Sequence, residues 1–462
     1  MKERKFHMPT AYTILFLLLI LVAAATWIIP AGSYDYVDGV PVAGTYHAVA
    51  QNPQGVGDVL KAAFSGFYDA VDVCIFILMV GGFLGVVMKT GAVDAGVSNI
   101  IRLLGGREKW LIPILMLLFG LGGTTYGMWE ETMAFYPLLI PVFLAAGYDA
   151  VVGISVILLG AGAGVIASTV NPFATGIAAG FAGVSLGEGI LLRLLEWVAF
   201  EAAAIWFVMA YAARVKRNPS KSVVGVGAGR IQVTMDQQVP FTPKRKVIMA
   251  IFTLTFLIMV YAVVPFDEMG LSLPTLGWWF PELSALFLVG GVVIGLIDRM
   301  SEEELTETYV AGCADLLGVA FIIGISRGIT VLMRDGAITD TILHWGEAAL
   351  SGAGAVSFTL LVFALYLPLT ILIPSSSGLA TLSIPIVAPL GKFAGVGGDL
   401  VVTAFQSASG LVNILTPTAA VVMGALALGH VPYDRWVKYV WKLMAVFLLL
   451  ALAFLAAGVL LG

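Results

Sequence analysis

Ser168-Thr-Val-Asn-Pro-Phe-Ala-Thr-Gly176 interrupts an otherwise apolar run between residues 150 and 187. A proline inside a helix removes one backbone hydrogen bond and leaves a carbonyl free. The whole run is long enough to cross a membrane, because about 20 apolar residues span a hydrocarbon core about 30 Å thick. Irregular backbone is tolerated at that depth only where it lines a cavity or is buried in protein. The stretch therefore predicts a membrane helix that is broken at a functionally important point.

The rest of the chain has the composition of a membrane protein. Of its 462 residues, 60% are hydrophobic and 11% are charged, whereas soluble domains carry about 25% charged residues. The apolar blocks predict an all-α polytopic protein with about nine full spans, since a β-barrel would show shorter, alternating segments. The first block, residues 11–30, could also be a signal peptide. Its length favours a retained span, because the apolar core of a signal peptide has about 7–15 residues.

Two further apolar segments are interrupted near their middles. Residues 110–147 contain Gly127-Met-Trp-Glu-Glu-Thr132, and residues 358–391 contain Pro374-Ser-Ser-Ser-Gly378. Each segment predicts a re-entrant helical hairpin with a polar tip. A second broken helix is expected at residues 400–430.

Basic residues predict the orientation, because cytoplasmic loops carry an excess of Lys and Arg. The N-terminus has Lys2, Arg4 and Lys5, and the segment 214–246 has eight basic residues. By contrast, residues 265–282 contain no Lys or Arg. The N-terminus is therefore expected in the cytoplasm and the C-terminus outside.

The chain contains a weak internal repeat. Val87-Met-Lys-Thr-Gly-Ala-Val93 resembles Leu332-Met-Arg-Asp-Gly-Ala-Ile338, and the order of spans, hairpin and broken helix is the same in both halves. Chance similarity between apolar stretches is the alternative. The loop charges place the two copies upside down to one another, which is the inverted repeat of many secondary carriers. The expected units are residues 1–213, a cytoplasmic linker at 214–246, and residues 247–462.

The two tips and the two breaks are expected to meet near the middle of the membrane. Hydroxyls and a glycine ahead of a helix N-terminus, as at Ser375–Gly378, suit a carboxylate. Glu130 and Glu131 are costly at that depth and are expected to face a cavity, where they could bind a cationic group, a coupling cation or a proton. The alternative is that this tip reaches the opposite interface and is wet. Arg327, inside a span, could bind a substrate carboxylate or pair with an acid such as Glu130 or Asp315.

Hydroxyl, amide and free carbonyl oxygens in the breaks would also suit a hard cation such as sodium, although they could simply stabilise a kink. The candidate substrate-binding residues are Glu130, Glu131, Thr132, Asn171, Thr175, Ser375, Ser376, Ser377, Gly378, Asn413, Thr416, Thr418 and Arg327. The candidate sodium ligands are Ser168, Asn171, Thr124, Ser376, Asn413 and Thr416.

No nucleotide-binding loop, metal-ligand cluster or nucleophile arrangement stands out in the sequence. We therefore expect neither an enzyme nor an ATP-driven pump, and no cofactor beyond Na⁺ or H⁺ as a coupling ion. The expected partners are a small molecule and the lipid bilayer, with no nucleic acid. Energy would come from an ion gradient or from exchange.

The segments 127–141, 169–176 and 374–378 resemble the YfcC-like branch of the four-carbon dicarboxylate anaerobic carrier family, over nearly the whole chain. The resemblance implies the ion transporter superfamily fold in a bacterial inner membrane, with scaffold and transport domains, an elevator-type motion and frequent homodimers. Members are dicarboxylate carriers or basic amino acid antiporters of the arginine/ornithine type. The chain lacks the strict Ser-Asn-Thr signature of many relatives, which leaves sodium coupling open.

The leading expectation is a secondary transporter of a small amino acid, a basic one, that works by exchange or cation coupling. It is motivated by Glu130 and Glu131 opposite a serine-rich tip. A C4-dicarboxylate transporter is the alternative, and a channel or non-transporting membrane scaffold is a third.

Overall fold

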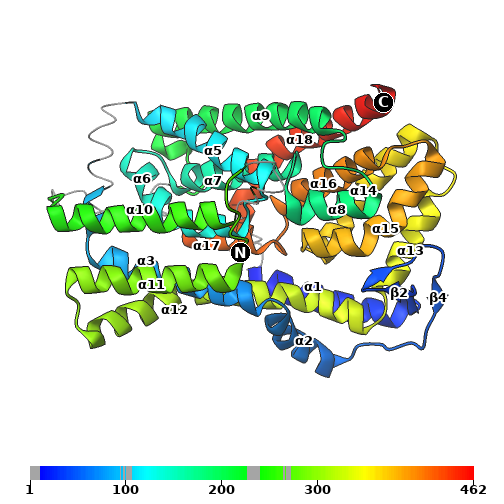
Figure 1. Ribbon diagram of the computed structural model, residues 1–462, viewed down its shortest axis with the longest axis horizontal. Coiled ribbons are helices and arrows are strands. Elements are labelled where there is room, and N and C mark those ends of the chain that lie inside the picture. Colours follow the sequence, from blue (N-terminus) through cyan, green and yellow to red (C-terminus); the bar gives the residue numbers. More distant parts are fainter. Residues whose placement is uncertain are drawn as a thin grey trace, which may run out of the picture.

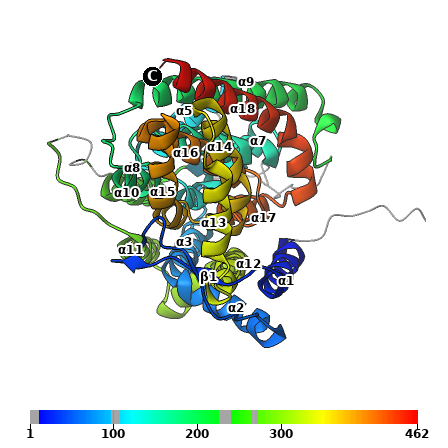
Figure 2. The same ribbon diagram turned by 90° about the vertical axis from the view of Figure 1, so that its right-hand side faces the viewer.

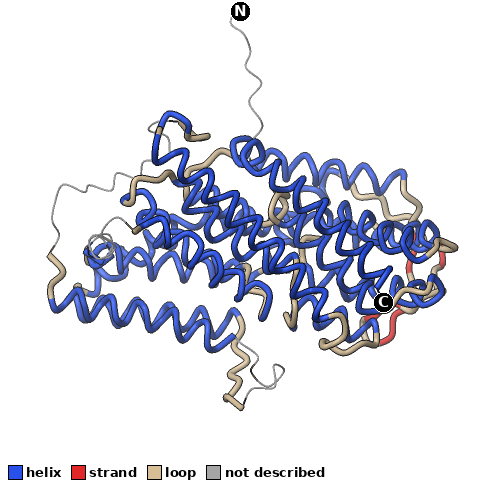
Figure 3. Tube along the Cα trace, turned by 90° about the horizontal axis from the view of Figure 1, so that it is seen from above, coloured by secondary structure: helices blue, strands red, loops and turns tan. Residues whose placement is uncertain are grey.

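The computed structural model describes residues 11–93, 95, 96, 99, 107–225, 240–263, 266 and 272–461. The basic residues Lys2, Arg4 and Lys5 and residues 226–239 of the expected linker lie outside this part. Within it the protein is mostly helical, and the strands lie together at one end of the molecule (Figure 3).

The helices form two layers (Figures 1 and 2). The first, called the α12 layer here, consists of α1 (Ala11–Ile28), α2 (Val56–Asp69), α3 (Val71–Lys89), α11 (Phe280–Asp298) and α12 (Glu302–Asp335). The second, the α7 layer, consists of α5 (Leu111–Thr125), η2 (Glu130–Phe135), α6 (Tyr136–Ala145), α7 (Ala150–Ile166), η3 (Pro172–Gly176), α8 (Ile177–Ala182), α9 (Ile190–Arg217), α14 (Ala355–Leu372), α15 (Ser376–Ala394), α16 (Gly398–Asn413), α17 (Ala420–Leu428) and α18 (Tyr433–Leu461). The remaining elements are η1 (Glu108–Trp110), η4 (Pro219–Lys221), α10 (Pro243–Val263), which packs on α11, and α13 (Thr339–Leu350), which contacts α14 and α15.

The α12 layer is held together by close helix crossings. A methyl group added at Gly312 of α12 would lie 2.4 Å from the carbonyl oxygen of Gly81 in α3. Small residues allow backbones in a membrane to approach this closely, so that van der Waals packing replaces the hydrophobic effect.

Six described helices are long and apolar enough to cross a membrane: Val71–Lys89, Phe280–Asp298, Glu302–Asp335, Ala355–Leu372, Ser376–Ala394 and Tyr433–Leu460. The protein is therefore a multi-pass membrane protein. The breaks expected from the sequence separate helices at the same places, because α7 ends at Ile166 and α16 ends at Asn413.

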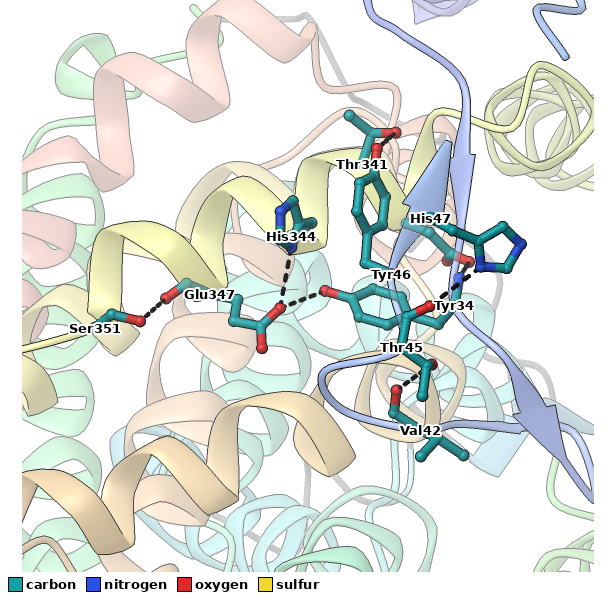
Figure 4. Close-up of polar contacts among 10 residues, drawn as sticks. Tyr34, Val42, Thr45, Tyr46, His47, Thr341, His344, Glu347 and Ser351 are labelled. Atoms are coloured by element: carbon teal, nitrogen blue, oxygen red, sulfur yellow. Dashed lines mark hydrogen bonds and ion pairs between the residues drawn. The ribbon is translucent and has the colours of Figure 1, made fainter. Parts of the chain in front are cut away.

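One segment departs from the all-helical expectation. Residues 32–48 form two short antiparallel pairs, β1 (Gly32–Ser33) with β4 (His47–Ala48) and β2 (Tyr36–Val37) with β3 (Val40–Pro41). This segment is fastened to α13 by side chains (Figure 4). The Tyr34 hydroxyl donates to Glu347 Oε2 (2.8 Å), and the ring of His344 stacks on Tyr46 with ring centres 4.1 Å apart.

Candidate functional site

A polar cavity of about 130 Å³ lies between the two layers and adjoins a smaller one of about 40 Å³. A buried water needs roughly 10–15 Å³, so the larger cavity has room for a small molecule. The α12 layer contributes Val73, Phe280 and Arg327. The α7 layer and its breaks contribute Gly127, Trp129, Glu130, Glu131, Val165, Asn171, Ala174, Pro374, Ser375, Ser376, Ser377, Gln406 and Asn413.

The tip after α5 brings the two glutamates to the cavity. Gly127 turns the chain with φ +78°, a left-handed conformation that glycine adopts without steric cost. A methyl group at Gly127 would also lie 2.4 Å from the side-chain amide of Asn171. This close approach joins the tip to the first break.

Charges of both signs meet in the cavity. Glu131 is buried, and its Oε2 accepts a hydrogen bond from the backbone N–H of Trp129 (3.1 Å). Arg327 lines the same cavity, and its Nε lies 4.0 Å from Oδ2 of Asp69 in α2. Asp69 already pairs with the guanidinium of Arg327 and offsets its positive charge. With Glu130 and Glu131 in the lining, the cavity wall is therefore acidic overall.

The opposite wall is the start of α15. Ser375 caps this helix, because its hydroxyl accepts from the backbone N–H of Gly378 (3.3 Å). Ser376 and Ser377 follow in the first turn and also line the cavity. A helix N-terminus that points into a cavity favours negatively charged groups there, through its dipole and its free N–H groups.

The first break is tied to the tip of α5. The Thr124 hydroxyl donates to the carbonyl of Ala167 (2.8 Å), and the Thr169 hydroxyl donates to the carbonyl of Thr124 (2.9 Å). Beside them, Thr175 donates to Ser168 Oγ (2.7 Å). These bonds satisfy polar groups that the interruption of the helix sets free.

Side chains also satisfy the carbonyls of the second break. Trp436 Nε1 donates to Ile414 O (3.2 Å), and the Tyr433 hydroxyl donates to Leu415 O (2.8 Å). Across the layers, the Ser326 hydroxyl donates to Thr418 O (2.6 Å).

The structure brings nine of the predicted site residues to the two cavities: Glu130, Glu131, Asn171, Ser375, Ser376, Ser377, Asn413 and Arg327 in the larger, and Thr418 in the smaller. Six others lie behind the lining: Thr132, Thr175, Gly378 and Thr416 of the substrate set, and Ser168 and Thr124 of the sodium set. All but the glycine have hydroxyls that are hydrogen-bonded to protein groups. Two acids were suggested as partners of Arg327. Glu130 lines the same cavities as Arg327, whereas the acid within ion-pair distance is Asp69 rather than Asp315.

Sequence reasoning missed Gln406 in α16. Gln406 lines the cavity, and its Oε1 has no hydrogen-bond partner among the described residues. Ser409 Oγ and Asn413 Oδ1 are likewise buried without a partner there. The three residues share one helix face, since they are spaced by three and four positions. Polar residues at this spacing in an otherwise apolar helix were the sequence signal that could have identified this face.

The chain is similar to known proteins over nearly its whole length. A family model described as C4-dicarboxylate anaerobic carrier matches residues 8–460. An uncharacterized protein of Haemophilus influenzae is 35% identical, with 97% of this chain and 96% of that protein covered. A protein of Escherichia coli K12 with the name "Putative basic amino acid antiporter YfcC" is 31% identical, with 94% and 93% covered.

Two solved transporters match at lower similarity. The YdaH transporter of Alcanivorax borkumensis is 14% identical, with a TM-score of 0.46 and 97% of this chain and 98% of that chain covered. MtrF of Neisseria gonorrhoeae is 17% identical, with a TM-score of 0.43 and 97% and 95% covered.

Proposed function

The chain belongs to the C4-dicarboxylate anaerobic carrier family, and from this membership we propose that it is a secondary transporter of a small basic amino acid. The name of the Escherichia coli relative supports an amino acid of this class. Arginine and ornithine are the first substrates to test.

The cavity's acidic balance carries the proposal. Glu130 and Glu131 line it together with the free acceptor oxygens of Gln406 and Asn413, whereas Arg327 is its one lining cation among the described residues. Acceptors that lack a donor in a buried site select a ligand that brings donors, because an unpaired buried polar group is costly. A guanidinium or an ammonium group brings several such donors.

A basic amino acid also matches the two-sided layout. Its side-chain cation would face Glu130 and Glu131, and its α-carboxylate would face the start of α15 at Ser375–Ser377. The α-carboxylate could also reach Arg327. The positive end of the ligand would thus face the acidic wall, and its negative end would face the wall that favours anions.

The proposed mechanism is alternating access by an elevator motion. The α7 layer would carry the cavity past the α12 layer, which acts as the scaffold. Coupling would be by exchange, or by Na⁺ or H⁺. Asn413, Asn171 and Ser376 are the sodium ligands that remain on the lining, with Ser168, Thr124 and Thr416 behind it.

We further propose that the protein works in a bacterial inner membrane, with a cytoplasmic N-terminus and as a homodimer. The distribution of Lys and Arg in the sequence supports the orientation, because residues 214–246 are rich in basic residues, as cytoplasmic loops are. The re-entrant nature of the two hairpins, the inverted repeat and the count of about nine spans belong to the same proposal.

A C4-dicarboxylate is the second candidate substrate. It is favoured by the description of the family and by Arg327, whose planar guanidinium suits carboxylates. The acid pair opposes it, because two carboxylates on the substrate would face two on the wall. Uptake of labelled succinate that arginine does not reduce would favour this candidate.

The test is transport in proteoliposomes. Labelled arginine should be taken up saturably and should leave faster when unlabelled arginine is present on the far side, a counterflow that a channel or a scaffold does not show. Glu130→Gln with Glu131→Gln should lower uptake at least tenfold, while Glu303→Gln, an exposed acid of α12, should leave it unchanged. Undiminished uptake in the double variant would refute the assignment.

A further inference from the structure

Helix α9 carries a carboxyl group that the cavity does not use. Glu201 is 2% exposed, and neither of its carboxyl oxygens has a hydrogen-bond partner among the described residues. The carboxyl lies over Gly120 of α5, where an added methyl group would come within 2.5 Å of Oε2. The indole N–H of Trp197, one turn earlier on α9, lies near the same point and is also without a partner there. The missing side chain at Gly120 thus makes a buried pocket for an acid.

The helices packed against α9 offer this acid no opposite charge. Neither α5 nor α7 contains an ionisable residue. Helix α18 is apolar after Lys442, and Phe447, which packs on Phe200 next to Glu201, lies in that apolar part. The ionisable residues of α18 precede it: Tyr433, Asp434, Arg435, Lys438, Tyr439 and Lys442. The short η4 contributes only the exposed Lys221.

The charged groups of α9 itself are distant or already engaged. Arg193 precedes Glu201 by eight residues, about 12 Å along the helix, and donates to the carbonyls of Leu186 (2.6 Å) and Glu188 (2.9 Å). Glu196, a like charge, accepts from Ser407 of α16 through Oε1 (2.8 Å), and its Oε2 has no partner among the described residues.

Toward the other end of α9, Tyr211 donates to Asp149 of the α6–α7 loop (2.6 Å). The basic residues Arg214, Lys216 and Arg217 lie in the last turn. An ionised Glu201 would therefore be an isolated buried charge, which is far more costly than a neutral carboxylic acid in the same place. The geometry describes a carboxyl that holds a proton.

The position of this carboxyl connects it to the cavity. Gly120 lies one turn before Thr124, which bonds the first break, and α5 leads directly into the tip that carries Glu130 and Glu131. Ionising Glu201 requires water or a cation to enter between α9 and α5. Such an opening displaces the helix that positions the tip.

We propose that Glu201 is a proton-binding site of the transport cycle, separate from the substrate cavity and coupled to it through α5. This inference rests on the proposed transport function. In one step, the carboxylate takes a proton from the water on one side and forms an O–H bond. In the other, that bond breaks and the proton enters the water on the opposite side, with no other reactant.

The first experiment needs no substrate. Infrared spectra of the purified full-length protein across a pH series report the carbonyl stretch of protonated carboxylic acids. We expect one band of the wild type that disappears at high pH to be lost in Glu201→Gln, while bands of other buried carboxyls such as Glu196 remain. Glu196→Gln is the matched control, because it makes the same change in the same buried helix, at a carboxyl with one oxygen bonded to a hydroxyl and the other without a described partner. This control should keep the band that Glu201→Gln removes.

The second experiment uses proteoliposomes with an inwardly directed proton gradient. The gradient should increase arginine accumulation in the wild type, and in Glu201→Gln that increase should fall at least tenfold. If the wild type transports no arginine, the proposed substrate is wrong, while the infrared result still decides the proton site.

Three results would overturn the inference. One is an infrared spectrum from which Glu201→Gln removes no carboxylic-acid band, or only a band that Glu196→Gln also removes, and another is an undiminished response to the gradient. If Glu201→Gln does not fold, Gly120→Ala can be tested instead, because it keeps Glu201 and places a methyl group against its carboxyl. The infrared band of Glu201 should then shift, and a band at the wild-type position in this variant is the third result.

Discussion

The side-chain amide of Gln406 in α16 donates a 2.7 Å hydrogen bond to the backbone carbonyl of Val165, near the end of α7. Because the nitrogen is engaged by an acceptor, the orientation of the amide is fixed. The oxygen Oε1 is left without a described partner at the cavity that both residues line. The helix break and the ligand site thus share one side chain.

Gln406→Leu should weaken arginine binding at least tenfold. A hydrogen bond to a charged group contributes about 1.5–3 kcal/mol, and 1.4 kcal/mol corresponds to a factor of ten. A thermal-shift titration with arginine measures the change. Thr403→Val is the control, since its hydroxyl bonds only within α16, to Asp399 O. Equal affinities in the wild type and Gln406→Leu would contradict a contact between Gln406 and the ligand.

A disulfide between the layers should stop transport. A Cβ placed at Gly424 of α17 lies 2.8 Å from Cγ1 of Val319 in α12, so cysteines at the two positions come near the Cβ separation of about 3.5–4.5 Å that a disulfide needs. The pair Val319→Cys and Gly424→Cys is built after Cys74 and Cys313 are replaced. Oxidation should reduce uptake to background, and a reductant should restore it.

A disulfide inside one layer is the control for this experiment. Gly391 of α15 and Val401 of α16 are comparably close, with 2.9 Å from the built Cβ to Cγ2 of the valine. Cysteines there should cross-link without stopping transport. Full activity with the interlayer bond formed would show that the layers do not need to move past one another.

Tyr34→Phe should destabilise the strand segment at α13. The Tyr34 ring is buried and its hydroxyl donates to Glu347, so the loss should be about 1–2 kcal/mol in the free energy of unfolding. Burial, followed by the hydrogen bond and charge of Glu347, raises the pKa of Tyr34.

A raised folded-state pKa means that the contribution of this hydroxyl is complete below the ordinary tyrosine pKa of about 10 and is lost as the pH rises through the raised value. The difference in melting temperature between wild type and Tyr34→Phe should thus be constant from about pH 8 to 9. A melting temperature unchanged by the substitution would show that the bond contributes nothing.

Gly312→Ala should lower the thermal stability of the α12 layer. The added methyl group would meet the Gly81 carbonyl, and overpacking of this kind costs typically 1–3 kcal/mol. Gly180→Ala in α8 is the matched control, because nothing lies within 4 Å of its built Cβ. That control should be neutral or stabilising by up to about 1 kcal/mol. Melting curves followed by fluorescence distinguish the two.

The sequence predicted the helix breaks of this fold but did not predict helix α2. Proline and polar residues within apolar runs mark breaks, and helices α7 and α16 end beside the marked stretches. Helix α2 was not predicted, because its polar residues alternate with apolar ones in a segment that reads as an external loop.

The cavity was predicted in part for a related reason. Tips and breaks identify where backbone is irregular, so Glu130 and Ser376 could be named. Arg327 was found because a charge in a span is rare. Which neighbour approaches a regular helix depends on tertiary packing, which periodicity does not encode. Asp69 beside Arg327 and Gln406 beside Val165 therefore emerged only from the structure.

The cavity between the layers takes its acids from one layer and its guanidinium from the other. A molecule that bound Arg327 and Glu130 tightly at the same time would link the two layers and oppose any movement of one against the other. Under the proposed elevator motion, a transported substrate would have to release either Arg327 or Glu130 before the layers move past one another. Tight binding of a ligand to both layers would therefore slow its transport. An inhibitor could be designed by lengthening a substrate until it stays bound to Arg327 and Glu130 at once.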